Sequence, residues 1–189
     1  MFLRIGLTLL AGLIVLAAVI VGLAAVKPDT LRVERTASIK AAPEKIFFLL
    51  NDFNNFTAWS PYEKKDPNMK RVISGAPAGK GAVYEWDGNE TVGKGRLAIV
   101  DSVPPKKIDM TLDFEKPFPA NNIVVFTLQP KGDATDVTWT MHGPAPFVSK
   151  LMQVFFDMDQ MVGADFETGL ANLKTLAEST NPPPGEPAQ

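Results

Sequence analysis

The fold of this chain is decided by one stretch, FVSKLMQVFFDMDQMVGADFETGLANLKTLA, which occupies residues 147–177. At about 100° per residue its large apolar side chains fall on one broad face, and most of its polar ones fall on the other. Pro146 stands where a helix can begin, and Pro182 lies beyond the point where it must have ended. The stretch therefore predicts one amphipathic helix of about 45 Å, and its apolar face needs a partner of similar length.

A series of strand patterns between residues 31 and 142 supplies that partner. Within Lys107–Glu115, the apolar Ile108, Met110 and Leu112 alternate with charged and hydroxyl side chains, as in a strand with one buried face. Turns rich in glycine and proline separate neighbouring strands, so we expect hairpins and an antiparallel sheet. The seven expected strands are residues 31–40, 70–74, 81–86, 96–103, 107–115, 123–129 and 136–142.

Two short helices, over residues 43–50 and 51–59, are expected between the first two strands. Pro43 and Glu44 suit the first turn of the first of these helices. The chain is thus predicted to be an α+β protein in which a seven-stranded antiparallel sheet wraps round a long C-terminal helix.

The N-terminal segment is predicted to be a transmembrane anchor. Residues 5–26 carry no charge, and as a helix they would extend about 33 Å, enough to cross a bilayer once. A cleaved signal peptide is the alternative, since Arg4 precedes the run, but its apolar region would be shorter. Positive residues flank both ends, so the side of the membrane stays open. The predicted organisation is an anchor over residues 1–26, a linker over 27–30, a folded domain over 31–178 and a disordered, proline-rich tail over 179–189.

The composition excludes several classes of function. The chain has no cysteine, which rules out disulfides, thiolate metal sites and a cysteine nucleophile. Its one histidine, His142, is expected at the surface near the end of a strand, and no cluster of metal-ligating side chains accompanies it. We therefore expect no metal and no other cofactor. The net charge of -2 provides no basic surface for nucleic acid.

Two segments carry a resemblance to a known family. VERTASIKAAPEKIFFLLNDF at residues 33–53, followed by Trp59, Ser60 and Pro61, resembles the beginning of the START-like, polyketide cyclase/dehydrase-like superfamily (SRPBCC). GADFETGLANLK at residues 163–174 resembles its closing helix. The resemblance covers residues 31–178 and implies the helix-grip fold, in which a curved sheet holds the last helix around an internal cavity for an apolar ligand. It implies no particular reaction, because the superfamily includes carriers as well as cyclases.

The inward positions of the strands and the helix provide candidate cavity residues. From the residues alone, these side chains would form an ordinary hydrophobic core. With the resemblance added, we expect them to line a partly filled cavity, because methionine and aromatic side chains form adaptable binding surfaces. The candidates are Tyr84, Trp86, Met110, Leu112, Phe114, Phe126, Trp139, Met141, Phe155, Met158, Val162 and Phe166.

Asp165 is the one candidate for catalysis. It falls within the apolar face of the predicted helix, where a carboxylate is costly unless it is paired. Arg35 and Arg71 take inward strand positions and could each form a structural ion pair with it. Alternatively, a buried carboxylate at this position could act as a general acid or base.

These expectations favour a membrane-anchored binding module for a hydrophobic small molecule or lipid. The alternative is an enzyme of the cyclase, dehydratase or hydrolase type that uses a buried carboxylate such as Asp165. A third interpretation, a scaffold domain that binds a protein partner, requires a large exposed apolar patch on the sheet. The charged outer face of Lys107–Glu115 argues against such a patch on that strand.

Overall fold

The structure is a computed structural model that describes residues 2–179, except for the side chains of residues 2–5 and 8 in the first helix. The predicted tail, residues 179–189, lies outside the described residues apart from Ser179. In chain order the elements are α1 (Phe2–Ala25), β1 (Thr30–Ile39), α2 (Pro43–Asn51), the 3-10 helix η1 (Phe53–Asn55), α3 (Phe56–Trp59), α4 (Tyr62–Lys65), β2 (Lys70–Gly75), β3 (Ala82–Asp87), β4 (Lys94–Val103), β5 (Lys107–Lys116), β6 (Ala120–Lys131), β7 (Ala134–Pro144), α5 (Phe147–Phe155) and α6 (Met158–Glu178).

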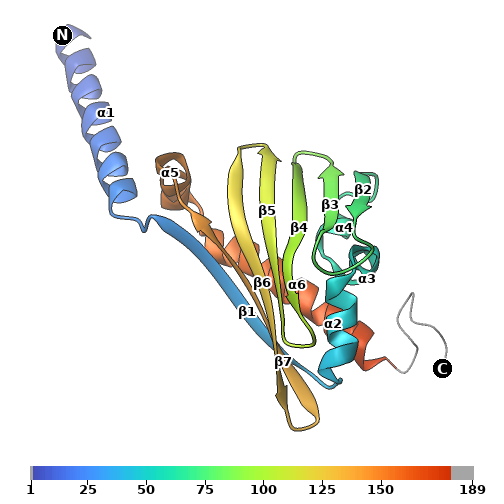
Figure 1. The fold of residues 1–189 in the computed structure, drawn as a ribbon. Coiled ribbons are helices and arrows are strands. Elements are labelled where there is room, and N and C mark those ends of the chain that lie inside the picture. Colours follow the sequence, from blue (N-terminus) through green and yellow to red (C-terminus); the bar gives the residue numbers. More distant parts are fainter. Residues whose placement is uncertain (1, 180–189) are drawn as a thin grey trace.

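Within these described residues, seven strands form one antiparallel sheet in the order β1-β7-β6-β5-β4-β3-β2. The first strand therefore pairs with the last, from Thr30 opposite Pro144 to Ile39 opposite Thr135. α6 crosses one face of the sheet, and α2, α3 and α4 lie beside its β2 end (Figure 1). The prediction of an α+β fold with a seven-stranded antiparallel sheet and a long C-terminal helix is confirmed, and the arrangement fits the helix-grip fold.

The core lies between the sheet and α6. On β5, the alternation seen in the sequence buries Ile108, Met110 and Leu112. Phe166 and Leu173 of α6 belong to the same continuous cluster of buried apolar side chains. Full burial of one such side chain contributes about 1.5–3 kcal/mol, so this cluster is what holds the helix on the sheet.

The prediction of a single helix over residues 147–177 is wrong. The segment is broken at Phe156, whose backbone is extended (φ -127°, ψ 135°), and it forms the two helices α5 and α6. The side chain of Asp157 accepts a hydrogen bond from the backbone N–H of Gln160. Aspartate in this position stabilises a helix N-terminus, so a new helix begins here. We call Phe156 and Asp157 the elbow; it lets α5 leave the line of α6 and contact α1.

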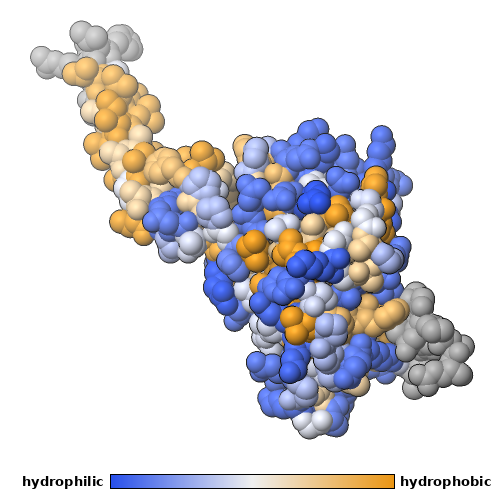
Figure 2. Space-filling view, viewed as in Figure 1, coloured by the Kyte–Doolittle hydropathy of each residue, from blue (hydrophilic) through white to orange (hydrophobic). Residues whose placement is uncertain are grey.

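α1 projects away from the sheet and approaches α5 at its C-terminal end (Figure 1). Its described side chains are mostly exposed, among them Leu13, Leu16 and Val19. Figure 2 shows the apolar surface that results along this helix. Among the described residues, no helix is both long enough and apolar enough to cross a membrane.

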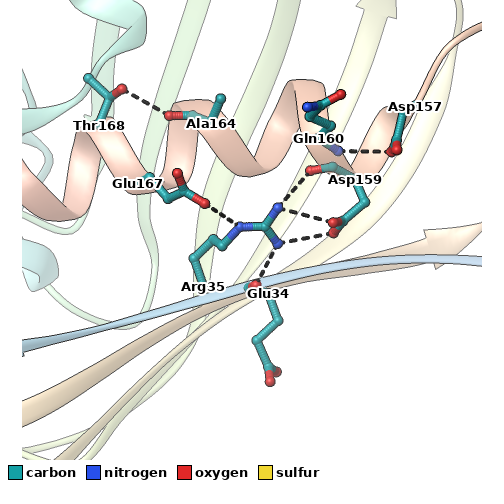
Figure 3. Close-up of polar contacts among 8 residues, drawn as sticks. All are labelled: Glu34, Arg35, Asp157, Asp159, Gln160, Ala164, Glu167 and Thr168. Carbon is teal, nitrogen blue, oxygen red and sulfur yellow. Dashed lines mark hydrogen bonds and ion pairs between the residues drawn. The ribbon is translucent and has the colours of Figure 1, made fainter.

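Arg35 of β1 fastens the first strand to α6 (Figure 3). Its guanidinium donates from Nε to Glu167 Oε1 (2.8 Å) and from Nη2 to Asp159 Oδ2 (3.0 Å). Asp159, Gly163 and Glu167 are spaced four residues apart, so they lie in a row along the helix. A Cβ atom at Gly163 would collide with the guanidinium. The arginine can therefore cross the helix only because this position is a glycine.

Two further hydrogen bonds join β1 to the C-terminal part of α6. Lys174 Nζ donates to the carbonyl of Ser38, and Glu178 Oε1 accepts from the backbone N–H of Lys40, each at 2.7 Å. The hydrogen bonds from Arg35 hold the pKa of Asp159 below its usual value, and Lys174 does the same for Glu178. Because the folded-state pKa is the lower one, these carboxylates stabilise the fold above about pH 4, and that stabilisation is lost as the pH falls further.

We expect the effect of Gly163→Ala to depend on Arg35. Alanine gains about 1 kcal/mol over glycine from helix propensity, but here its methyl group displaces the guanidinium from Asp159 and Glu167. In an Arg35→Ala background only the gain remains. Gly163→Ala should therefore stabilise that background and be neutral or destabilising in the wild type.

Urea unfolding of the wild type, the two single variants and the double variant measures this dependence. We expect the two effects of Gly163→Ala to differ by roughly 1–2 kcal/mol, since both carboxylates are largely exposed and the ion pairs are correspondingly weakened by solvent. Equal effects in both backgrounds would show that the glycine does not accommodate the arginine.

Candidate ligand site

The side chains predicted to line a cavity lie mainly between the sheet and α6. The exception is Phe155, which α5 carries outward and which is exposed. Among the others, Tyr84, Met110, Leu112, Phe126, Trp139, Met141 and Phe166 are buried, and Trp86, Phe114, Met158 and Val162 are partly buried.

These interior side chains pack directly on one another. Trp139 stacks on Phe166 with ring centroids 4.0 Å apart, and Phe126 lies 5.0 Å from Trp139. Trp59, which the sequence analysis left out of the set, makes edge contacts with both Phe126 and Trp139. Gly169 faces Trp139 at a position where a Cβ would collide with the indole, so this glycine permits the close stacking. The inward positions therefore form an aromatic core around Trp139.

A cleft of about 610 Å³ opens beside this core, between residues 27–32 and 153–159. We call it the linker cleft. It exists because the chain turns at the elbow instead of continuing as one helix along β1. Its volume lies within the usual range of small-molecule sites. Its lining includes the apolar side chains of Leu31, Val154, Phe155, Phe156 and Met158, and the charged side chains of Lys27, Arg32, Asp157 and Asp159.

The lining of the linker cleft determines what it can hold. Aliphatic and aromatic walls favour an apolar body. Lys27 and Arg32 are matched by the carboxylates of Asp157 and Asp159, and Arg32 also pairs with Glu34, so the charges of the lining offset one another. The cleft therefore suits a molecule that combines an apolar part with a polar head.

A second, smaller cleft of about 240 Å³ lies between α2 and the turn at Pro104 and Pro105. Phe47, Phe48 and Glu44 are among its lining residues. This volume is below the range typical of ligand sites, and its lining contains none of the side chains predicted for the cavity.

Asp165 lies on α6 and pairs with a lysine, not with an arginine as expected. Its carboxylate is 2.7 Å from Nζ of Lys65 in α4. Arg35 is engaged by α6 at a different place, and Arg71 pairs with Glu63. The Lys65–Asp165 pair therefore ties α4 to α6, and Asp165 lines neither cleft.

His142 lies in β7 and is half-buried. Among the described residues, its Nδ1 atom has no hydrogen-bond partner. Nowhere in residues 2–179 does the structure bring three or more histidine or acidic side chains together in a way that could hold a metal ion.

One polar cluster was missed by the sequence analysis. Tyr84 Oη donates to Glu63 Oε1 at 2.5 Å, and Arg71 Nη1 lies 3.2 Å from Glu63 Oε2. Both Tyr84 and Glu63 are buried, beneath the rings of Phe53 and Phe56. Burial, together with the hydrogen bond to the carboxylate, raises the pKa of Tyr84 well above its usual value. The phenol therefore stays protonated at physiological pH and acts as a hydrogen-bond donor.

Comparison with known proteins places the fold. A family model described as "Polyketide cyclase / dehydrase and lipid transport" matches residues 30–178. A comparison with curated protein sequences finds no match.

Several solved structures share the fold. A protein from Chromobacterium violaceum, CV1439, is 19% identical with a TM-score of 0.57, and the match covers 81% of this chain and 99% of that one. The Aha1 protein from Colwellia psychrerythraea is 19% identical with a TM-score of 0.53, covering 78% and 96%. DynU16, from the dynemicin biosynthetic locus, is 18% identical with a TM-score of 0.56, covering 82% of this chain and 49% of its own. At these identities the likeness concerns the fold alone.

The two tyrosines of the chain offer a matched test of the buried polar cluster. Tyr84→Phe leaves the buried Glu63 without its hydroxyl donor, and we expect it to lower the free energy of unfolding by about 1–3 kcal/mol. The Tyr62 hydroxyl makes no hydrogen bond among the described residues, although burial and the charge of Asp165 raise its pKa. We therefore expect a smaller loss from Tyr62→Phe. Thermal or urea unfolding of both variants compares them; an equal loss would mean that the Tyr84–Glu63 hydrogen bond contributes little.

Proposed function

The chain belongs to the polyketide cyclase/dehydrase and lipid transport family, and from this premise we propose that it is a membrane-anchored module that binds a hydrophobic small molecule or lipid. The fold of this family is one that binds hydrophobic ligands. The linker cleft is the observation that carries the proposal, because it joins apolar walls to polar and charged side chains in a volume of ligand size.

We propose that the linker cleft gives access to the interior of the fold. Met158 lines the cleft and is partly buried, and Val162, one turn further along α6, packs against the core cluster. Methionine adapts its shape to a neighbour at low cost. We propose that the apolar part of the ligand enters here and extends between α6 and β1, while its head stays near Lys27 and Arg32.

The anchor in this proposal is the uncharged run over residues 5–26. Its support is the length of the run in the sequence, about 33 Å as a helix, and the exposure of the apolar side chains described in α1. The segment between Ala25 and Thr30 is short, spanning at most about 18 Å when extended. A bilayer around α1 would therefore lie next to the linker cleft, and a ligand could pass between them without crossing water.

Binding is proposed in preference to catalysis. Two carboxylates could serve as a buried acid or base. Asp165 is paired with Lys65, and Glu63 is bound by Tyr84 and Arg71. Neither carboxylate lines a described cleft. A general acid or base must reach the group on which it acts, and these two reach structural partners instead.

Two valine positions in α5 test the linker cleft. Val154 lines the cleft, whereas Val148 faces away from it and is exposed. We expect Val154→Trp to fill the cleft and to weaken the binding of an anthroyloxy-labelled stearate by about tenfold, which corresponds to about 1.4 kcal/mol. Val148→Trp introduces the same side chain in the same helix, and we expect it to leave the affinity within about twofold.

The measurement is a fluorescence titration of the full chain in detergent, accompanied by mass spectrometry of the molecules extracted from the purified wild type. We expect an apolar molecule to be extracted and to be lost from the Val154→Trp variant. A wild type that neither carries nor binds an apolar molecule would contradict the proposed function. Equal binding by the two variants would place the ligand outside the linker cleft.

A further inference from the structure

We propose that the outward side of α5 lies in the headgroup region of the bilayer, so that this short helix forms a second membrane contact beside α1. The α5 face consists of Val148, Met152 and Phe155, with Phe147 and Phe156 at its two ends. The inference rests on the proposed function for its picture of the anchor, but it concerns a different element and can fail separately.

α5 has the reverse of the usual amphipathic arrangement. Val148, Met152 and Phe155 are spaced four and three residues apart, so they lie on one side of the helix. That side faces outward: their exposed fractions are 58%, 40% and 61%. None of the side chains described in α5 is buried. A surface helix of a water-soluble domain normally turns its apolar stripe to the core, so this stripe requires an apolar environment of its own.

Polar contacts hold α5 in this orientation. Lys150, on the inward side, pairs with Asp29 of the linker, and its side chain is nearly covered. The carbonyl of Asp29 also accepts a hydrogen bond from the backbone N–H of Ala145 (2.7 Å), just before the helix begins. At the other end, the elbow and its Asp157 cap fix the direction in which the chain leaves α5. The apolar side chains are thus presented outward by the fold.

Lipid is the occupant that suits the surroundings of the α5 face. α5 packs against α1, and Figure 2 shows apolar surface continuing from α1 onto the part of the domain where α5 lies. Lys27 and Arg32 lie beside this junction, with Asp157 and Asp159 in the same cleft lining. The two cationic side chains could meet anionic headgroups. A short helix with an aromatic and aliphatic face, next to basic residues and level with the end of the proposed anchor, fits an element at the bilayer interface.

This placement gives α5 a role in ligand uptake. Its outward side would contact lipid, while Gln153 and Val154 on its other side line the linker cleft. The helix would therefore separate the bilayer from the cleft by its own thickness. A hydrophobic ligand would enter around Phe155 and Phe156, which contribute both to the α5 face and to the lining of the cleft.

The absence of cysteine from the chain allows a direct test. Single cysteines would be introduced in the full chain by Val148→Cys, Met152→Cys and Phe155→Cys, labelled with the environment-sensitive dye NBD, and reconstituted in vesicles of phosphatidylcholine and phosphatidylglycerol. Lys131→Cys, at the exposed turn between β6 and β7, is the control. Leu13→Cys, in the middle of α1, reports on the anchor independently.

We expect lipids with a quenching doxyl group near the headgroup to quench the three α5 labels several-fold more than the label at residue 131. We expect doxyl groups deep in the acyl chains to quench the label at residue 13. The substituted α5 side chains are exposed, so the variants should fold, and circular dichroism melting would verify this.

The outcomes separate the two proposals. Quenching at residue 13 without quenching on α5 would overturn the α5 contact and leave the anchor standing. Quenching on α5 without quenching at residue 13 would support the α5 contact and overturn the anchor. Labels on α5 that are shielded from water but insensitive to doxyl lipids would show that a protein, or a second copy of this chain, covers the helix, and would also overturn the proposal.

Discussion

The guanidinium of Arg35 lies across α6 at Gly163, the one position without a side chain in the row formed by Asp159, Gly163 and Glu167. β1 is the first strand of the chain and an edge of the sheet, yet it must be joined to β7 and to a helix more than a hundred residues away in sequence. Arg35 makes that junction with two carboxylates, one on each side of Gly163. Asp159 is in the first turn of α6, so the same contact fixes where the helix starts relative to the sheet. The position of the elbow, and hence of the linker cleft, depends on it.

The strands could be predicted from the sequence because alternation reports directly on a buried face. On β5, Ile108, Met110 and Leu112 are buried as expected, and Phe114 is partly buried. The break in the C-terminal segment could not be read in this way. Asp157 falls on the polar side of a continuous helical pattern, where it is consistent with a helix interior. Only the hydrogen bond to Gln160 reveals it as an N-cap, and side-chain capping competes with helix continuation by an amount too small to see in periodicity.

The candidate site was predictable in part. Inward parity identified the residues between the sheet and α6, but parity gives the direction of a side chain and not the volume left beside it. The stacking of Trp139 on Phe166 depends on distances that no pattern contains. Phe155 was misplaced because the phase of α6 was extended through the elbow. The pairing of Glu63 with Tyr84 and Arg71 escaped notice because α4 has only four residues, too few to show a helical period.

The elbow also divides the C-terminal segment into two parts of unequal local stability. α6 contributes Phe166, Leu170 and Leu173 to the core, so it can detach only when the whole domain unfolds. None of the side chains described in α5 is buried in the core. The attachment of α5 rests on its contact with α1 and on the Lys150–Asp29 ion pair. Local opening of such an element requires much less free energy than global unfolding. The backbone amides of α5 should therefore exchange with solvent long before those of α6. The helix beside the linker cleft can open locally while α6 stays packed on the sheet.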